Sequence, residues 1–102
     1  MAKNKNDYQI DNKEFDKIKN KALIIDVRDQ EEFQLLKKIP HSINVPYRQL
    51  IAHPEKFITT KEEIVVTICN AGHRSTAAAQ SLREQGYQNA FVLITGIYGY
   101  YR

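Results

Sequence analysis

The 102-residue chain contains a single cysteine, four glycines, three prolines and no tryptophan. One cysteine excludes an internal disulfide, and a free thiol is typical of a reducing compartment. No apolar run approaches the roughly 18 residues of a membrane-spanning helix, and the polar N-terminus lacks the apolar segment of a signal peptide. We therefore expect a cytoplasmic protein with no membrane partner.

An excess of one charge sign is also lacking. The 15 lysines and arginines outnumber the 12 aspartates and glutamates by only three, and both signs are mixed near the N-terminus. This mixture is typical of a solvated surface and does not favour nucleic-acid binding. A chain of this length builds one core. We expect a single domain over residues 1–102, with a polar lead-in at 1–10 and a core from about 11 to 102.

Short apolar runs alternate with amphipathic segments along the chain. The apolar runs predict strands at 22–27, 42–46, 63–69 and 90–94. The amphipathic segments predict helices at 11–20, 29–38 and 75–86, and a segment at 47–57 that Pro54 interrupts or restarts. This order predicts an α/β fold whose mostly parallel central sheet is flanked by helices on both faces.

The expected helix at 29–38 carries a clear N-terminal signal, because Asp29 is followed three residues later by Glu32. Phe33 and Leu36 are expected to supply its apolar side. The two lysines at 37 and 38 suit the negative C-terminal end of such a helix.

The single cysteine, Cys69, ends a buried strand just before a helix. In parallel sheets, sites form beyond the carboxyl ends of the strands. Gly72 lets the backbone curl so that several N–H groups point at one spot, and the start of the helix adds its unpaired N–H groups and positive dipole end. His73 and Arg74 add side-chain donors. Such surroundings favour the thiolate, which is the nucleophilic form of cysteine.

A lone cysteine at a strand end is more often an inert core residue. The glycine, arginine and serine that follow Cys69 within six positions favour a reactive or anion-binding loop instead. We therefore assign Cys69 as the candidate nucleophile. The candidate substrate-binding residues are Asn70, Ala71, Gly72, His73, Arg74 and Ser75.

Asp26 and Arg28 follow the first buried strand, and they reach the same rim as Cys69 if the two strands are neighbours. We expect Asp26 to orient Arg74 or the loop backbone, while a helix cap or a structural ion pair is an equally open interpretation. His41 and His53 are interpreted as loop or surface residues. The histidines and the cysteine have no zinc-ligand spacing, so no metal site is predicted.

Most of the chain resembles the single-domain rhodanese-like proteins of the thiosulfate sulfurtransferase family. The family pattern Cys-x-x-Gly-x-Arg-Ser, an alanine-rich helix and a glycine–aromatic pair correspond here to "CNAGHRSTAAAQSLREQGY". The segments "LIIDVRDQEEF", "IPHSINVP" and "LITGIYGYY" also resemble family segments, in family order. This chain departs from the family at four places, which bear on packing and substrate entry: Lys37-Lys38, His41-Ser42, Thr95 and Tyr100.

The resemblance implies a sulfurtransferase that needs no cofactor. The Cys69 thiolate would attack the outer sulfur of a small anionic donor such as thiosulfate, and sulfite would leave. The resulting persulfide would pass its sulfur to cyanide or to a thiol acceptor. The loop N–H groups would hold the persulfide sulfur, and Arg74 would bind the donor or product anion.

Three alternatives remain beside this activity. A phosphatase or arsenate reductase of related fold would need five residues between cysteine and arginine, whereas four separate Cys69 from Arg74. A persulfide carrier that delivers sulfur to a partner protein would use the same residues and stays open. A non-catalytic binding module is disfavoured, because such modules commonly lose the cysteine.

Overall fold

The computed structural model describes residues 7–102, and residues 1–6 of the expected lead-in lie outside the described residues. Five strands form one sheet in the order β1-β5-β4-β2-β3, and every pair of neighbours is parallel. The strands are β1 (Gln9–Ile10), β2 (Leu23–Asp26), β3 (Ile43–Asn44), β4 (Val65–Ile68) and β5 (Ala90–Leu93). The predicted parallel α/β fold is confirmed.

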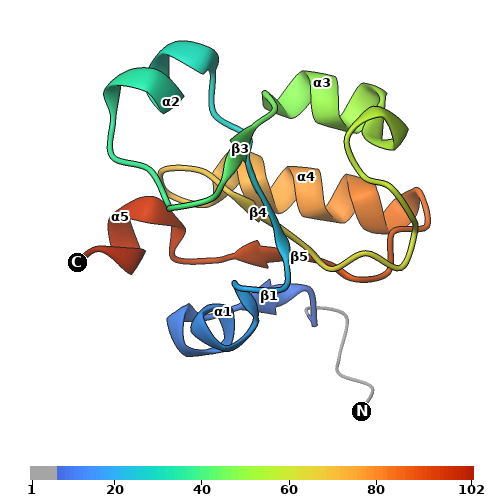
Figure 1. Cartoon of the computed structure of the whole chain (residues 1–102), viewed down its shortest axis with the longest axis horizontal. Helices are drawn as coiled ribbons and strands as arrows, with labels where there is room; N and C mark the ends of the chain where they lie inside the picture. The colour runs from blue at the N-terminus through green and yellow to red at the C-terminus, as the bar shows by residue number, and fades with distance from the viewer. Residues whose placement is uncertain (1–6) are drawn as a thin grey trace.

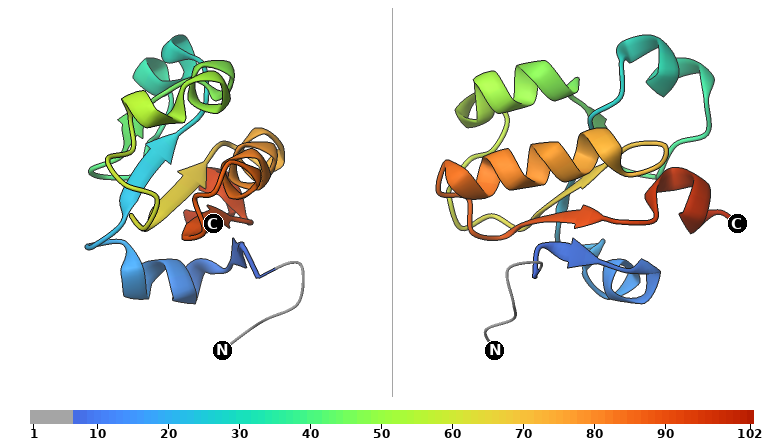
Figure 2. Two further views of the ribbon diagram at one scale, coloured as in Figure 1. Left: turned by 90° about the vertical axis from the view of Figure 1, so that its right-hand side faces the viewer. Right: turned by 180° about the vertical axis from the view of Figure 1, so that it is seen from behind.

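Helices cover both faces of this sheet (Figures 1 and 2). The helices are α1 (Asn12–Ile18), α2 (Gln30–Leu35), α3 (Tyr47–Ala52), α4 (His73–Glu84) and α5 (Gly96–Tyr100), with a 3-10 turn η1 (Pro54–Lys56). On one face, Leu50 of α3 and Leu82 of α4 pack against side chains of β2 and β4. On the other face, Phe15 of α1 and Ile97 of α5 join a second cluster with the alternate strand residues. Because successive side chains of a strand point to opposite faces of the sheet, the core is divided into two layers.

The order of the strands places the carboxyl ends of β2 and β4 side by side. β2 and β4 are neighbours with Asp26 opposite Ile68, so Cys69 emerges beside the residues that follow β2. The continuous apolar run of β4 is buried at every position, as expected for a central parallel strand covered on both faces. None of the described helices is long and apolar enough to cross a membrane.

The helix expected at 29–38 is shorter than predicted. α2 ends at Leu35, and the chain leaves it in an extended conformation at Leu36. Leu36 is 44 % exposed and Leu35 is 81 % exposed, so the prediction that Leu36 supplies a packed apolar side is wrong. The lysines at 37 and 38 lie beyond the helix end. The buried Arg28 donates a hydrogen bond to the Lys37 carbonyl at 3.2 Å, a contact that this extended segment supplies.

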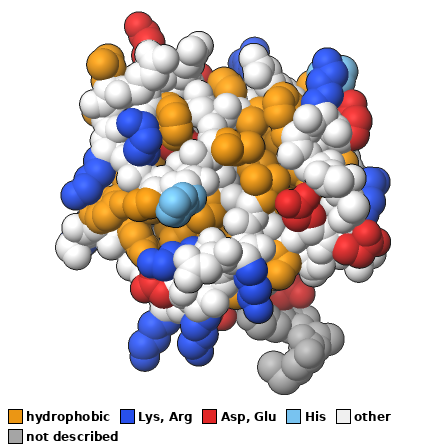
Figure 3. Space-filling model, in the orientation of Figure 1, with side chains coloured by type: hydrophobic (Ala, Val, Ile, Leu, Met, Phe, Trp, Pro, Cys, Tyr) orange, Lys and Arg blue, Asp and Glu red, His pale blue; other side chains and the backbone are white. Residues whose placement is uncertain are grey.

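The last helix, α5, has no counterpart among the predicted elements. Its Tyr100 packs edge-on against Phe15, with ring centroids 5.4 Å apart, and its hydroxyl donates to Asp16. Tyr98 of the same helix is 60 % exposed. Figure 3 shows hydrophobic side chains gathered over this part of the molecule. The C-terminal segment therefore packs through one tyrosine and presents another to solvent.

Candidate active site

Cys69 lies directly after β4 with its side chain enclosed by the loop. The residue is only 2 % exposed. Its Sγ accepts the backbone N–H of Gly72 at 3.2 Å and that of Ser75 at 3.4 Å, and it lies 3.2 Å from Ser75 Oγ. Two backbone N–H donors and one hydroxyl that is able to donate thus converge on a single sulfur atom, which is the arrangement that stabilises an anionic sulfur.

The curl of the loop depends on Gly72. Its φ is 101°, and a Cβ there would lie 2.8 Å from the Ile94 carbonyl oxygen, so only glycine fits. Because the chain turns here, α4 begins at His73, two residues earlier than predicted. Thr67 Oγ1 donates to the Ser75 carbonyl at 2.8 Å, which fixes the first turn of α4 against β4.

Arg74 is paired with a carboxylate that the sequence did not single out for this role. Its Nη1 and Nη2 donate to Glu32 Oε1 and Oε2 at 2.8 and 3.1 Å. The expectation that Asp26 orients Arg74 is therefore wrong. Glu32 Oε1 also accepts the backbone N–H of Asp29 at 3.0 Å. Glu32, which caps the start of α2, therefore also holds the Arg74 side chain in place.

Asp26 and Arg28 form a second, buried ion pair, as the structural interpretation of these residues anticipated. Arg28 Nη2 lies 2.7 Å from Asp26 Oδ2, and both side chains are completely buried. Arg28 Nη1 donates to Asn70 Oδ1 at 2.8 Å, and Asn70 Nδ2 donates to Glu32 at 3.4 Å. Asp26 therefore supports the loop through Arg28 and Asn70.

The start of α5 holds the loop from its other side. The Ile97 N–H donates to the Cys69 carbonyl at 2.9 Å, and the Tyr98 N–H donates to the Asn70 carbonyl at 3.1 Å. A Cβ at Gly96, where φ is 69°, would lie within 2.3 Å of the Asn70 carbonyl oxygen. Glycine is thus required at this position by the approach of the C-terminal segment to the loop.

The structure brings together most of the predicted site residues. Cys69, Gly72 and Ser75 meet at the sulfur, while Asn70 and Arg74 belong to the polar network behind it. Ala71 and His73 are exposed at the bend of the loop, and His41 and His53 lie on the surface as expected. The sequence interpretation missed three contributors: Glu32, Thr67 and Gly96. Thr67 is a polar residue in an aliphatic strand, which was a usable signal.

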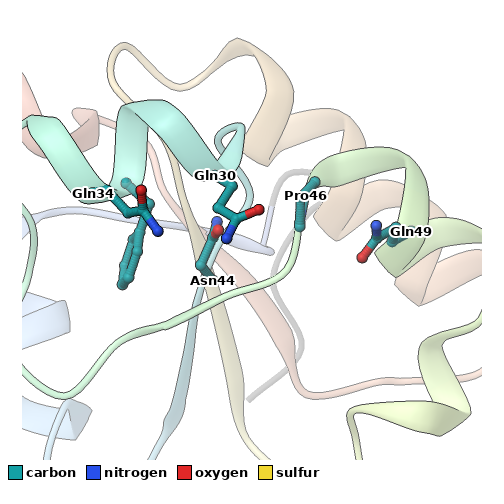
Figure 4. A pocket seen from close by; sticks show the side chains of 6 residues that line it. Gln30, Gln34, Asn44, Pro46 and Gln49 are labelled. Atoms are coloured by element: carbon teal, nitrogen blue, oxygen red, sulfur yellow. The ribbon is translucent and has the colours of Figure 1, made fainter.

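A hollow between α2 and α3 lies near the carboxyl end of β3 (Figure 4). Its lining residues are Gln30, Phe33, Gln34, Asn44, Pro46 and Gln49. Asn44 Nδ2 donates to the carbonyls of Asp26 and Arg28, so Asn44 braces the end of β2. The lining contains no charged side chain, so this hollow offers no cation to an anionic donor.

The paired state of Glu32 predicts a pH effect on stability. The hydrogen bonds from Arg74 lower the pKa of the Glu32 carboxyl below its ordinary value of 4.5. The unfolded chain then binds more protons than the folded one, so stability is lost as the pH falls from about 5 through the folded pKa. The charges of Arg74 and Arg28 and the backbone N–H of Asp29 also lower the pKa of this carboxyl, while its partial burial raises it.

Glu32→Gln is the variant that isolates this effect, because glutamine can still accept the Asp29 N–H. We expect thermal melts between pH 6 and pH 3.5 to show a smaller fall in melting temperature for Glu32→Gln than for the parent. The exposed Glu31→Gln serves as the control and should follow the parent. Equal falls in all three proteins would contradict the paired state of Glu32.

Comparison with known proteins gives a match to one family model. The model of the rhodanese-like domain matches residues 11–102. The chain belongs to this family. The predicted resemblance, which rested on the loop and its flanking segments, is thereby confirmed.

Sequence relatives of this rhodanese-like domain fall into two kinds. Over 78 residues it is 33 % identical to the thiosulfate sulfurtransferase GlpE of Coxiella burnetii, covering 76 % of this chain and 70 % of that protein. Over 74 residues it is 32 % identical to the adenylyltransferase and sulfurtransferase uba4 of Ogataea parapolymorpha, covering 72 % of this chain. The domain spans only about a fifth of the length of such Uba4 relatives.

Solved structures show the same fold. The human single-domain sulfurtransferase TSTD1 superimposes with a TM-score of 0.83 at 23 % identity, covering 92 % of this chain and 95 % of that one. A rhodanese-related protein from Thermoplasma volcanium superimposes with a TM-score of 0.79 at 26 % identity, covering 91 % and 89 %. The sheet order and the five helices described above are therefore those of a rhodanese-like domain.

Proposed function

We propose that this rhodanese-like domain is a sulfurtransferase that carries the transferred sulfur on Cys69. The observation that supports this most directly is the enclosure of Sγ by the N–H groups of Gly72 and Ser75 and by the Ser75 hydroxyl. A persulfide is an anion, and backbone N–H groups aimed at one point stabilise an anion without adding a mobile side chain. The thiosulfate sulfurtransferase named among the relatives adds to this proposal.

The reaction proceeds in two half-reactions. The Cys69 thiolate attacks the outer sulfur of thiosulfate, an S–S bond forms to Sγ, and the bond to the central sulfur breaks as sulfite leaves with its electron pair. A nucleophilic acceptor, such as a thiolate or cyanide, then takes the outer sulfur and regenerates the Cys69 thiolate. Arg74 is held by Glu32 at the first turn of α4, so this ion pair fixes the start of the helix whose N–H groups face the sulfur.

Mass spectrometry of the intact protein tests the proposal. After incubation with thiosulfate, we expect a gain of one sulfur atom per chain, and the gain should disappear on addition of cyanide with release of thiocyanate. Because the chain has one cysteine, the added sulfur has a single place to reside. A protein that never gains sulfur from thiosulfate or from an organic donor would overturn the proposal.

A persulfide carrier in a sulfur relay is the second candidate. The similarity to a segment of Uba4, which is named both an adenylyltransferase and a sulfurtransferase, favours this possibility. A carrier would form the same persulfide but would transfer it slowly to free cyanide and quickly to a partner protein. Comparing the two acceptors with a preloaded protein separates a carrier from a free enzyme.

The length of the loop predicts negligible phosphatase activity. Four residues separate Cys69 from Arg74, and Arg74 is occupied by the Glu32 carboxylate, so no free guanidinium is available to cradle a tetrahedral phosphate. Turnover of p-nitrophenyl phosphate by the parent should not exceed that of Cys69→Ser. A clear excess of the parent over this variant would show that the argument from spacing is wrong.

A further inference from the structure

Thr67 is the one polar residue in the buried strand β4. Its neighbours in the strand are Val65, Val66 and Ile68, and the Thr67 side chain is completely buried. Burial of a hydroxyl is unfavourable unless the hydroxyl forms a hydrogen bond, whereas valine would fill nearly the same space without this cost. Packing alone therefore favours valine at this position, and the contacts of Thr67 show what its hydroxyl adds.

The Thr67 hydroxyl connects β4 to the first turn of α4. Its Oγ1 lies 2.8 Å from the Ser75 carbonyl oxygen and 3.3 Å from the Phe91 carbonyl oxygen of β5. A hydroxyl has a single proton to donate, so the shorter contact, to Ser75, is the stronger one. Thr67 and Cys69 lie two positions apart, and alternate residues of a strand point to the same face of the sheet. Both side chains therefore contact Ser75.

Ser75 is held through all three of its polar groups. Its backbone nitrogen and its Oγ lie 3.4 and 3.2 Å from Cys69 Sγ, while its carbonyl accepts the Thr67 hydroxyl. Hydrogen bonds weaken steeply as distance and alignment are lost. A displacement of the first turn of α4 away from β4 would therefore weaken the support that Ser75 gives to an anionic sulfur.

We propose that Thr67 is a positioning residue of the active site. By holding the Ser75 carbonyl, it keeps the Ser75 N–H and hydroxyl directed at the sulfur of Cys69. This inference rests on the proposed function, since the sulfur that Ser75 faces is the thiolate before the first half-reaction and carries the transferred sulfur after it. Thr67 acts through Ser75, so the hydroxyl of Thr67, and not its bulk, is the part that serves the reaction.

Two substitutions separate the hydroxyl of Thr67 from its bulk. Thr67→Val removes the hydroxyl and nearly keeps the shape, whereas Thr67→Ser keeps the hydroxyl and loses a buried methyl group. For Thr67→Val we expect persulfide formation at saturating thiosulfate to be about fivefold slower than in the parent, which is the effect of one lost hydrogen bond. Thr67→Ser should react within about twofold of the parent, although its melting temperature should fall because a methyl group is lost from the core.

The rates are measured in single turnovers of the full chain. The protein is mixed with thiosulfate, the reaction is stopped at successive times, and the gain of sulfur per folded molecule is followed by mass spectrometry. A purely structural role of Thr67 predicts the reverse order of the two variants, because Thr67→Val keeps the packing of the core and Thr67→Ser does not.

Alkylation of Cys69 by iodoacetamide gives a second measurement that needs no sulfur donor. The thiolate is the reactive form, so weaker support of the anion slows the reaction at neutral pH and has no effect once the thiol is fully ionised. For Thr67→Val we expect an alkylation rate about threefold below that of the parent at about pH 7 and equal to it at about pH 10. The titratable side chains beside the loop, His73, Arg74 and Glu32, are the same in both proteins.

Thr76→Val is the matched control. It makes the same substitution at the residue after Ser75, and the Thr76 hydroxyl has no hydrogen-bond partner among residues 7–102. The Thr76 backbone N–H, which donates to the Gly72 carbonyl at 3.0 Å, is kept. We expect this variant to match the parent in persulfide formation and in alkylation. A rate as low as that of Thr67→Val would show that any valine near the start of α4 disturbs the loop, and the role assigned to Thr67 would be overturned.

The two measurements distinguish a failure of this inference from a failure of the proposed function. If the parent never gains sulfur, the sulfurtransferase proposal is wrong, and the alkylation series alone decides whether Thr67 supports an anionic sulfur. If the parent forms a persulfide and Thr67→Val keeps the parent rates of persulfide formation and alkylation, the positioning role is overturned and the proposed function stands. Equal losses in Thr67→Val and Thr67→Ser would overturn the positioning role as well, because the hydroxyl would not be the part that matters.

Discussion

Replacement of Cys69 by serine is expected to abolish persulfide formation and to lower thiocyanate production by at least about a thousandfold. A hydroxyl is far less ionised than a thiol at neutral pH, and an alcohol oxygen cannot form a persulfide. Serine is close in size to cysteine and can accept the N–H groups that now reach Sγ from Gly72 and Ser75. The loss should therefore reflect chemistry and not unfolding.

A thermal melt beside the assay completes this test. Cys69→Ser should melt within a few degrees of the parent, because the residue is small and its N–H partners are kept. A persulfide carrier would show the same loss of persulfide in Cys69→Ser. Only the comparison of cyanide with a partner protein as the sulfur acceptor distinguishes a carrier from a free enzyme. Thiocyanate production by Cys69→Ser at the parent rate would show that the sulfur does not pass through this residue.

Arg28→Ala is expected to cost about 3–5 kcal/mol of unfolding free energy, because it leaves the buried Asp26 carboxylate without its partner. Asp26 accepts hydrogen bonds from Arg28 Nε and Nη2 and from the Arg28 backbone, and two of these three groups disappear. The Asn70 side chain loses its 2.8 Å donor as well. Urea unfolding followed by circular dichroism measures the loss.

A double variant separates the buried charge from the lost packing. Asp26→Asn combined with Arg28→Met removes both charges and keeps most of the volume, so it should be more stable than Arg28→Ala. Persulfide formation per folded molecule should be lower than in the parent for Arg28→Ala and for the double variant, since both lack the guanidinium that donates to Asn70. If Arg28→Ala unfolds at the same urea concentration as the parent, the ion pair contributes no stability and the argument is wrong.

Local sequence signals were enough to predict three of the strands, the start of α1 and the loop at Cys69. The apolar runs that became β2, β4 and β5 were readable because a buried parallel strand needs apolar residues on both faces. The start of α1 was readable because Asp11 and Glu14 cap each other within one turn, and the structure contains this reciprocal pair. The loop at Cys69 was readable because Gly72 and the following helix act on their immediate neighbours.

Tertiary structure alone decided which charges meet. Four acidic residues lie between positions 26 and 32, and the sequence gives no distance from any of them to Arg74. Only the placement of β2 beside β4 and the way α2 leaves β2 bring Glu32 to Arg74, 42 positions away. The same Glu32 carries a clear local signal as a capping residue, which is why its second role stayed hidden.

The approach of the C-terminal segment to the loop was likewise a tertiary result. Gly96 is required because a Cβ at this position would overlap the Asn70 carbonyl oxygen. The two residues meet because α5 packs on the sheet and donates hydrogen bonds to the loop from Ile97 and Tyr98. Local signals arise from atoms a few bonds apart and survive in any context. Contacts between distant segments depend on the order of the strands and on which side chains fill the core, and these exist only once the chain has folded.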